Sequence, residues 1–247
     1  MRKGRCASNP VAMVTAAAIL AVATACAGPT TVTPRDVEAE RAAAPEFALD
    51  ATDIVHPAEL PALGKWMVDS DGTVAHWLDA TYDGKHLREP INVILFDGGA
   101  EDAASAKQRL RAATTAAGYP SRRGHSGGYR GYVAGDFYDQ LPAEENHAFS
   151  NRFYIFNNNH GRIFGPAPFA DGYLFIGAFS RERVAPLDRL KHQYSSFDRA
   201  RDDFAQRLAA NTDYAIVGFA DMDNTFLGDP LITTGDHDGN AVRLRMD

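Results

Sequence analysis

The sequence predicts a single α+β domain over residues 51–247, in which a mixed or antiparallel sheet is accompanied by two main helices. Two observations predict this class. Short runs of β-branched and aromatic residues recur along the chain, and two helical segments are inserted among them. Strands in series with only two helices favour α+β over a doubly wound parallel sheet. The chain shows no internal repeat and no second linker, so one domain is the simplest organisation.

The strands are predicted from short apolar runs. Residues 91–96 are nearly all apolar, and Pro90 and Gly98 bound them, which is typical of a buried strand. Near the C-terminus, Val242 and Leu244 alternate with arginines, which indicates a half-buried last strand. Three further strands are expected where aromatic and apolar residues cluster: Phe153–Phe156, Tyr173–Phe179 and Tyr214–Ala220.

Two helices are predicted between these strands. The first spans Glu101–Ala117, with acidic residues in its first turn and Gly118 as its stop. The second begins at Ser195-x-x-Asp198, which has the pattern of a capping box, and ends at Asn211. Its apolar residues lie near one stripe, which predicts packing against the sheet: Phe197, Ala200, Phe204 and Leu208.

The first 25 residues have the order of a secretory signal peptide. Three basic residues near the start precede the apolar run Val11–Thr24, which, allowing for its small alanines and threonines, supplies about half of the ~20 apolar residues that a membrane span needs. Ala23, Thr24 and Ala25 then lead directly to Cys26. This is similar to the lipobox of bacterial lipoproteins, in which the signal peptidase cuts before a cysteine that carries a diacylglyceryl group. Ala23 stands where that pattern usually has leucine.

The resemblance implies an exported protein that is held on the outer side of the cell membrane by lipid on Cys26. Each buried methylene of an acyl chain contributes about 0.8 kcal/mol to such anchoring. The alternative is an ordinary Ala-x-Ala signal peptide that leaves Cys26 unmodified. Residues 26–50 are rich in Ala, Thr, Pro and charge, with almost no large apolar side chain. That composition predicts a flexible tether between the lipidated cysteine and the domain.

Cysteine content and charge exclude several functions. Cys6 lies in the predicted signal peptide, so a lipidated Cys26 leaves the domain without a thiol for a disulfide, a metal or a nucleophile. The formal charge of −7 becomes about −10 once the basic residues of the signal peptide are removed. A chain this acidic is not expected to bind nucleic acid or an anionic membrane through its bulk surface.

Several short segments over about residues 90–210 together resemble the C-terminal domain of LssY-type proteins. They occur in the expected order: Pro90–Val93, Ala116–Tyr119, His160–Phe164, Phe175–Ser180, His192 and Asp198–Asp202. The family pattern usually has Trp where Tyr119 stands. It also has His-His-x-Arg where this chain has Asn159-His160-Gly161-Arg162. The resemblance implies a fold rather than an activity, and it groups His192 with His160 and Arg162.

Two catalytic motifs are spelled in the sequence without their structural context. Residues 221–225 match the first motif of haloacid-dehalogenase-type phosphatases, but only 22 residues follow it, too few for the rest of that site. We therefore expect a strand that ends in a solvated turn. Residues 124–128 spell the G-x-S-x-G of a nucleophile elbow around Ser126, without a hydrophobic strand before it or a helix after it. A Gly/Ser loop is the favoured interpretation there.

Acidic residues near the C-terminus are weak candidates for calcium ligands. Calcium takes six to eight oxygen ligands, and oxygen-rich loops supply them. The spacing of an EF-hand fails because Phe226 stands where glycine is required. Residues 236–240 are better interpreted as a turn before the last strand. The candidates are Asp221, Asp223, Asp236 and Asp238.

His160 and Arg162 are the most promising catalytic candidates. In a strand they would point to the same side and could hold a phosphate or carboxylate, with the guanidinium as a bidentate donor. His192 is the third candidate, and the alternative is a surface histidine beside a structural arginine. The eight histidines show no H-x-x-x-H or H-E-x-x-H spacing, so the sequence predicts no zinc site and no other cofactor.

Two functions follow from these patterns. The first is a non-catalytic envelope lipoprotein that binds a small molecule or an envelope protein, and it predicts an apolar cavity with few titratable groups. The second is an envelope hydrolase or phosphate-handling enzyme. It predicts that His160, Arg162 and His192 converge in one concave pocket beside a carboxylate.

Overall fold

The structure is a computed structural model that describes residues 49–185 and 191–247. The predicted signal peptide, Cys26 and nearly all of the predicted tether 26–50 lie outside the described residues. Within the described ranges, no helix is both long enough and apolar enough to cross a membrane.

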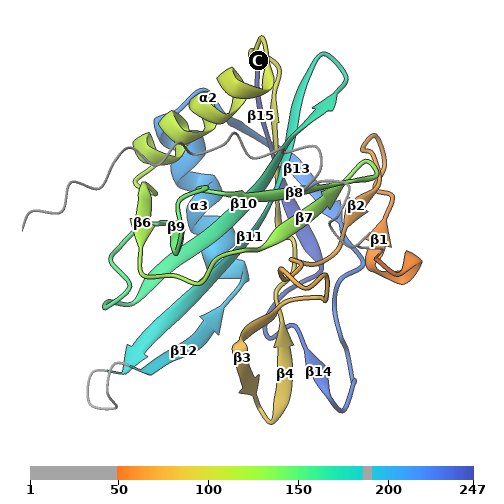
Figure 1. Ribbon diagram of the computed structural model, residues 1–247, viewed down its shortest axis with the longest axis vertical. Helices are drawn as coiled ribbons and strands as arrows, with labels where there is room; N and C mark the ends of the chain where they lie inside the picture. The colour runs from red at the N-terminus through yellow and green to blue at the C-terminus, as the bar shows by residue number, and fades with distance from the viewer. Residues whose placement is uncertain (1–48, 186–190) are drawn as a thin grey trace, which may run out of the picture. The chain divides into compact units, whose positions relative to one another are not determined.

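Two α-helices accompany a large, curled, mixed sheet, with 45% of the described residues in strands and 16% in helices, so strands dominate the fold (Figure 1). The predicted combination of a mixed sheet with two main helices is confirmed at this level. The strands of the large sheet are β1 (Ile54–Val55), β2 (Leu63–Gly64), β5 (Val93–Asp97), β6 (Ser121–Arg123), β7 (Arg130–Val133), β8 (Asp136–Leu141), β9 (His147–Ser150), β10 (Asn158–Phe169), β11 (Gly172–Ala185), β12 (Lys191–Ser196), β13 (Ala215–Asp221) and β15 (Asn240–Met246).

The main path of this sheet runs β1-β2-β7-β8-β10-β11-β5-β15-β13, with β12 paired to β11 and with β6 and β9 joined beside β10. Most neighbours are antiparallel, but β5 and β15 are parallel, which makes the sheet mixed. A smaller sheet contains β3 (His76–Tyr82), β4 (Lys85–Arg88) and β14 (Ile232–Thr233), and it lies at the lower end of the molecule in Figure 1. A short 3-10 helix, Ala51–Asp53, precedes β1.

Strand β5 explains why residues 91–96 are so uniformly apolar. It lies between β11 and β15, and both of its faces are covered. Val93 and Leu95 enter one core, whereas Ile94 and Phe96 enter the other. A strand buried on both faces loses the alternation of apolar and polar residues that a half-buried strand shows.

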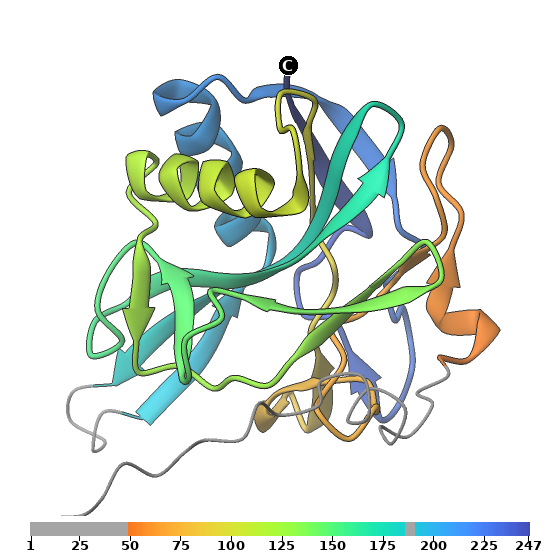
Figure 2. The same ribbon diagram turned by 45° about the horizontal axis from the view of Figure 1, so that its top comes forward.

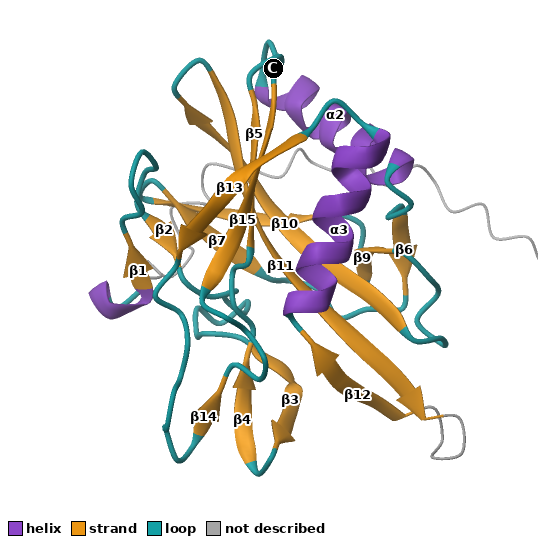
Figure 3. Ribbon diagram, turned by 180° about the vertical axis from the view of Figure 1, so that it is seen from behind, coloured by secondary structure: helices purple, strands orange, loops and turns teal. Residues whose placement is uncertain are grey.

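The two helices, α2 (Ala103–Ala116) and α3 (Asp198–Asn211), lie on the same side of the long β10–β11 hairpin (Figures 2 and 3). Side chains from both helices form the helix-side core with alternate residues of the strands, among them Leu110 of α2 and Phe204 of α3. A second core lies on the opposite face of the sheet, where Met67 and Phe164 are buried. We call them the helix-side core and the opposite core.

The starts of the two helices are set by different devices from those predicted, whereas Gly118 follows α2 as expected. Helix α2 begins with a capping box between Asp102 and Ser105, and Gly118 follows it with a positive φ of 80°. The predicted capping box from Ser195 does not form at α3. Instead, Ser196 Oγ accepts a hydrogen bond of 3.0 Å from the Arg199 amide, and Asp236 accepts one from the Phe197 amide. A residue distant in sequence therefore helps to begin α3.

The strand predicted at Phe153–Phe156 is wrong. These residues form an exposed turn, and β10 begins after them at Asn158. Their side chains are 41–59% exposed, with the guanidinium of Arg122 lying 4.6 Å from the ring centre of Phe153. Aromatic content indicates a strand when one face is buried against a core, and this segment has no such face.

Candidate functional site

The candidate site lies on one face of the β10–β11 hairpin. His160 and Arg162 are one residue apart in β10 and point to the same side, as alternate residues of a strand do. Across the strand pair, Ser180 lies opposite His160, and Glu182 lies opposite Asn158. The antiparallel register therefore brings a histidine, an arginine and a carboxylate onto one face.

Gly161, between the two candidates, keeps that face turned away from the helices. A Cβ at Gly161 would lie 2.5 Å from the ring of Phe179 and 2.6 Å from the carbonyl oxygen of Ala178. Phe179 belongs to the helix-side core, so Gly161 is where the backbone of β10 approaches that core most closely. His160 and Arg162 consequently face the opposite side of the sheet.

Segments from elsewhere in the chain close over this face. Trp77 comes from β3, Glu89 follows β4, His125 and Ser126 belong to the loop between β6 and β7, and His192 comes from β12. With His160, Arg162 and Glu182 they enclose a cavity of about 120 Å³. We call this cavity, with these eight residues, the histidine pocket.

Asn158 and Glu182 hold the histidines of the pocket in place. Asn158 Oδ1 lies 3.0 Å from Nδ1 of His160, and Asn158 Nδ2 donates to Glu182 Oε1 at 2.5 Å. The other carboxylate oxygen, Oε2, lies 2.8 Å from Nδ1 of His192. Glu182 therefore joins both sides of the pocket. His125 stacks on His160, with 4.6 Å between the ring centres.

Arg162 reaches from the hairpin to the covering loop. Its Nη2 donates to the backbone oxygen of Ser126 at 2.8 Å and to Ser126 Oγ at 3.1 Å. Ser126 Oγ also accepts a hydrogen bond from the hydroxyl of Tyr129. The Nε of Arg162 is buried and has no hydrogen-bond partner in the described part of the chain, which is also true of Nε2 of His125. The Nε of Arg162 is a donor, and Nε2 of His125 donates or accepts according to the tautomer of the ring. A ligand in the pocket could satisfy both atoms.

Burial shifts the pKa of three groups in the pocket. It lowers the pKa of His125 to about 3, with the positive charge of Arg162 adding to the effect. The pKa of His160 lies well below its ordinary value for the same reason, with His125 as the next cause. Both imidazoles are therefore neutral at pH 7. Burial raises the pKa of Glu89 to about 7, and Arg162 opposes this rise. A carboxyl group with that pKa can exchange a proton near neutral pH.

His160, Arg162 and His192, whose convergence the enzyme hypothesis requires, all line the histidine pocket beside Glu182. Sequence reasoning missed Glu182, Glu89, Trp77 and the role of His125. One signal was present for Glu182: the apolar run Tyr173–Phe179 is followed by four polar residues, Ser180–Arg183, in which Glu182 shares a face with Ser180. The prediction of no zinc site rested on local spacing, whereas the histidines that meet here are far apart in sequence.

Ser126 is not activated as a nucleophile. It lies in the loop between β6 and β7, so no helix follows it as a nucleophile elbow requires. Its Oγ accepts hydrogen bonds from Tyr129 and Arg162, and no described histidine nitrogen bonds to it. The loop expected over residues 124–128 is present.

The phosphatase-like motif also lacks its context. Strand β13 pairs antiparallel with β15 and ends at Asp221, whereas that chemistry needs the first Asp at the end of a parallel strand. Asp223 is exposed and forms an ion pair of 2.6 Å with Lys65. The strand ends where expected, but the solvated turn predicted after it is wrong, because Met222 and Asn224 are buried and the Asn224 amide donates to the backbone of Lys65 and Ile91.

The four calcium candidates have separate partners. Asp221 accepts a hydrogen bond from the amide of Asp223, and Asp223 pairs with Lys65. Asp236 accepts hydrogen bonds at the start of α3, and Asp238 pairs with Arg201 at 2.7 Å. Among them, only Asp238 joins a described group with metal-ligand geometry, together with Asp198 and His237. Arg201 pairs with both aspartates of that group.

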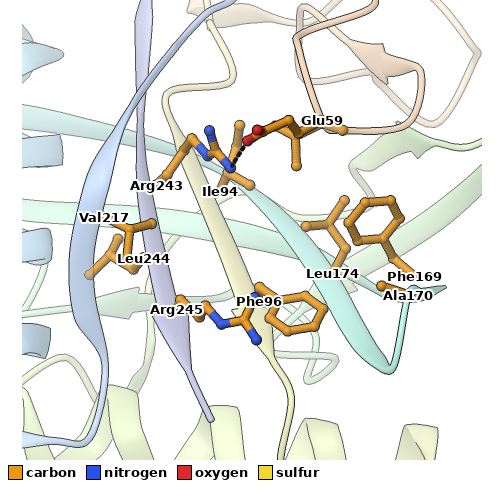
Figure 4. Close-up of a pocket in the computed structure, with 11 residues that line it drawn as sticks. Glu59, Ile94, Phe96, Phe169, Ala170, Leu174, Val217, Arg243, Leu244 and Arg245 are labelled. Atoms are coloured by element: carbon orange, nitrogen blue, oxygen red, sulfur yellow. Dashed lines mark ion pairs between the residues drawn. The ribbon is translucent and has the colours of Figure 1, made fainter.

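A second cavity, of about 190 Å³, lies beside the opposite core, on the face of β5 that carries Ile94 and Phe96, and is mainly apolar. Ile94, Phe96 and Leu174 line it, and two arginines stand at its edge (Figure 4). Arg243 forms an ion pair of 3.5 Å with Glu59, and the guanidinium of Arg245 lies 4.8 Å from the ring centre of Phe96. We call this cavity the apolar pocket.

Comparisons with known proteins supply no name for this arrangement. No protein-family model, no curated protein and no solved structure matches the chain. The histidine pocket and the apolar pocket are therefore the basis for inferring a function.

Proposed function

We propose that this protein is an exported lipoprotein, anchored through Cys26 on the outer side of the cell membrane, whose single α+β domain hydrolyses a small anionic ester in the histidine pocket. One observation carries the hydrolase proposal: His160 and Arg162 of β10 and His192 of β12 meet Glu182 and Glu89 in one small pocket. A small enclosed site with convergent titratable groups is typical of acid–base catalysis.

Each group has a role in this proposal. Arg162 holds the anionic part of the substrate, since its Nε is buried without a partner and guanidinium groups bind phosphate and carboxylate well. Glu89 removes a proton from the attacking water. The water oxygen forms a bond to phosphorus or to the carbonyl carbon, and the ester bond breaks. His192 in its protonated form, which Glu182 orients through Nδ1, gives its Nε2 proton to the leaving oxygen, and the proton that Glu89 gained is released as His192 is protonated again.

Hydrolysis of p-nitrophenyl phosphate and p-nitrophenyl acetate by the purified protein tests this proposal. We expect Glu89→Gln to lower kcat by about 10²–10⁴-fold, the usual contribution of a general base. Arg162→Gln should raise KM for the phosphate ester more than for the acetate. The control is Arg123→Gln, a surface arginine outside the pocket. If neither ester is hydrolysed and inorganic phosphate does not bind in calorimetry, the hydrolase proposal is wrong.

The anchor has its own test. Cys26→Ala should leave the protein unprocessed or release it from the membrane, because no diacylglyceryl group can be attached. Fractionation of cells that express each form measures this. If the Cys26→Ala protein is processed and stays on the membrane, the lipoprotein proposal is wrong.

The apolar pocket favours a second candidate function, in which the domain binds a short-chain amphiphilic acid without catalysis. The aliphatic and aromatic lining would take the chain, and Arg243 and Arg245 would meet the carboxylate. Calorimetry with octanoate tests it. We expect Arg243→Gln to weaken binding about tenfold and His160→Gln to leave it unchanged, and the reverse pattern would exclude the apolar pocket.

A further inference from the structure

We propose that the histidine pocket binds a divalent transition-metal ion, with Zn²⁺ as the best fit, through His125, His160 and Glu182. This inference builds on the proposed function, because the ion would occupy the same pocket. Metal binding can nevertheless be measured whether or not the pocket is catalytic.

The three side chains have the placement that a metal site needs. They are 8%, 5% and 2% exposed, and one ligand atom from each lies within 4.8 Å of the others. Ligands at about 2.0–2.2 Å in a tetrahedral zinc site are roughly 3.4 Å apart. Rotations that move each ligand atom by about 1 Å would therefore close the site. The backbone that carries His160 and Glu182 is already fixed by the β10–β11 pairing.

A buried ring nitrogen without a partner is an independent indication of a ligand. Nε2 of His125 is inaccessible to solvent and makes no hydrogen bond in the described part of the chain. Buried polar atoms are nearly always satisfied, so an unsatisfied one needs an explanation. A metal ion bound to this nitrogen would supply it.

Neighbouring residues orient the proposed ligands as in known metal sites. Asn158 Oδ1 lies 3.0 Å from Nδ1 of His160, and Ser180 Oγ lies 3.4 Å from Nε2 of that ring, so a metal ion on Nε2 would replace this contact with Ser180. Asn158 Nδ2 also donates to Glu182 Oε1. Metal-binding histidines usually donate their other ring N–H to such an acceptor, which fixes the tautomer and the ring orientation. One asparagine thus positions two of the three ligands.

The ligand set favours zinc over calcium or magnesium. Two imidazoles and one carboxylate form the set of catalytic zinc sites, in which a water molecule takes the fourth position. Calcium takes six to eight oxygen ligands and magnesium prefers oxygen in octahedral geometry, and the pocket offers neither. The cavity of about 120 Å³ has room for such a water beside the ion.

The second group with metal-ligand geometry, formed by Asp198, His237 and Asp238, is a useful contrast. Its two carboxylates already bind Arg201, at 3.3 and 2.7 Å. A cation there would compete with the guanidinium. In the histidine pocket, Glu182 pairs with no described arginine or lysine. We therefore assign the metal to the histidine pocket alone.

Calorimetric titration of the full-length protein with ZnCl₂, after treatment with a chelator, tests the proposal. We expect one Zn²⁺ per chain. His125→Gln and Glu182→Gln should each weaken binding more than 100-fold. Asn158→Ala should weaken it by about 10–100-fold, as expected for a residue that orients ligands. The control, His56→Gln, replaces an exposed histidine and should change nothing.

A second measurement protects the test against variants that do not fold. Co²⁺ bound to the wild-type protein should give the visible absorption of a tetrahedral N/O site, and Zn²⁺ should displace it. The proposal is wrong if the wild-type protein binds no Zn²⁺, or if folded His125→Gln and Glu182→Gln proteins bind it as the wild type does. If ester hydrolysis survives complete removal of the metal, the metal takes no part in the reaction and the hydrolase proposal stands. If the protein binds zinc but hydrolyses no ester, the metal site stands and the hydrolase proposal is wrong.

Discussion

The β10–β11 hairpin carries a polar cluster on each of its faces, and the two clusters are built differently. On the helix side, Asp203 accepts hydrogen bonds from Tyr119 at 2.6 Å, from Asn159 at 2.9 Å and from Arg207 at 3.0 Å. We call these four residues the Asp203 cluster. Burial alone would raise the pKa of Asp203, but these bonds outweigh it and lower the pKa.

The histidine pocket leaves polar atoms unsatisfied, namely Nε2 of His125 and Nε of Arg162, and it has a cavity beside them. Asn158 faces this pocket, whereas its neighbour Asn159 belongs to the Asp203 cluster. Two adjacent asparagines in one strand thus serve opposite purposes. The difference teaches that a satisfied cluster stabilises a fold, while an unsatisfied one beside a cavity is a place for a ligand.

The largest effect expected from this contrast is on the helix side. Phe204 is fully buried, and its ring centre lies 4.1 Å from that of Phe179 and 5.2 Å from that of Tyr119. Phe204→Ala should lower the free energy of unfolding by about 3–5 kcal/mol, because it leaves a cavity against the Asp203 cluster. Urea denaturation measures it. The matched change in the exposed turn 153–156 is Tyr154→Ala. It should lower the free energy of unfolding by less than about 1 kcal/mol, since Tyr154 is 42% exposed.

Next in size is a stabilising change in the pocket. The pKa of Glu89 is about 7 in the folded protein, above its value of 4.5 in the unfolded chain. Between these pH values the folded state binds the proton that the unfolded state has lost, so the stability contribution present below pH 4.5 is lost as the pH rises through 7.

Glu89→Gln removes this loss. In metal-free protein, the effect of this substitution on the free energy of unfolding should be about 3 kcal/mol more stabilising at pH 8 than at pH 4, since one pKa unit is worth about 1.4 kcal/mol. Denaturation curves at the two pH values measure the change. An equal effect of the substitution at both would contradict the assigned pKa.

A smaller loss is expected from Tyr119→Phe, which removes one donor to Asp203 and keeps the ring. We expect about 1–3 kcal/mol of destabilisation, because a partly buried carboxylate loses a charge-assisted hydrogen bond. Tyr129→Phe is the matched change beside the histidine pocket, where the hydroxyl bonds to Ser126. If Tyr129→Phe costs as much as Tyr119→Phe, the two clusters do not differ as described.

The smallest effect sets the baseline for the others. Arg111 and Glu144 form an ion pair of 2.6 Å, with the two side chains 61% and 38% exposed. Arg111→Gln should change the free energy of unfolding by less than about 1 kcal/mol, as exposed pairs do. Thermal unfolding measures this change. A loss above about 2 kcal/mol would contradict the baseline, because an exposed ion pair would then stabilise the fold as much as a hydrogen bond in the Asp203 cluster.

Much of the fold could be predicted from residue patterns. The apolar run at 91–96, the stop at Gly118 and the alternation around Val242 correspond to β5, the end of α2 and β15. Phe153–Phe156 was predicted wrongly because apolar composition does not show whether a core faces the segment. The capping of α3 by Asp236 was out of reach, since it depends on a contact between residues about 40 positions apart.

The site was predicted only as far as one strand allows. The pattern of alternate residues indicated that His160 and Arg162 share a face, and a family resemblance added His192. Glu182 and His125 reach the same cavity through the register of β10 with β11 and through a loop, and neither is visible in local spacing. Patterns within one element predict its faces, whereas a site between elements depends on pairing.

Gly161 limits how this chain can change. A residue with a Cβ at position 161 would collide with Phe179 and with the backbone of β11, whereas the side chains of His160 and Arg162 border the cavity. Substitutions at positions 160 and 162 can therefore change what the cavity binds, whereas a substitution at position 161 disturbs the packing of β10 on β11. The glycine of His-Gly-Arg is thus required by packing, not by chemistry.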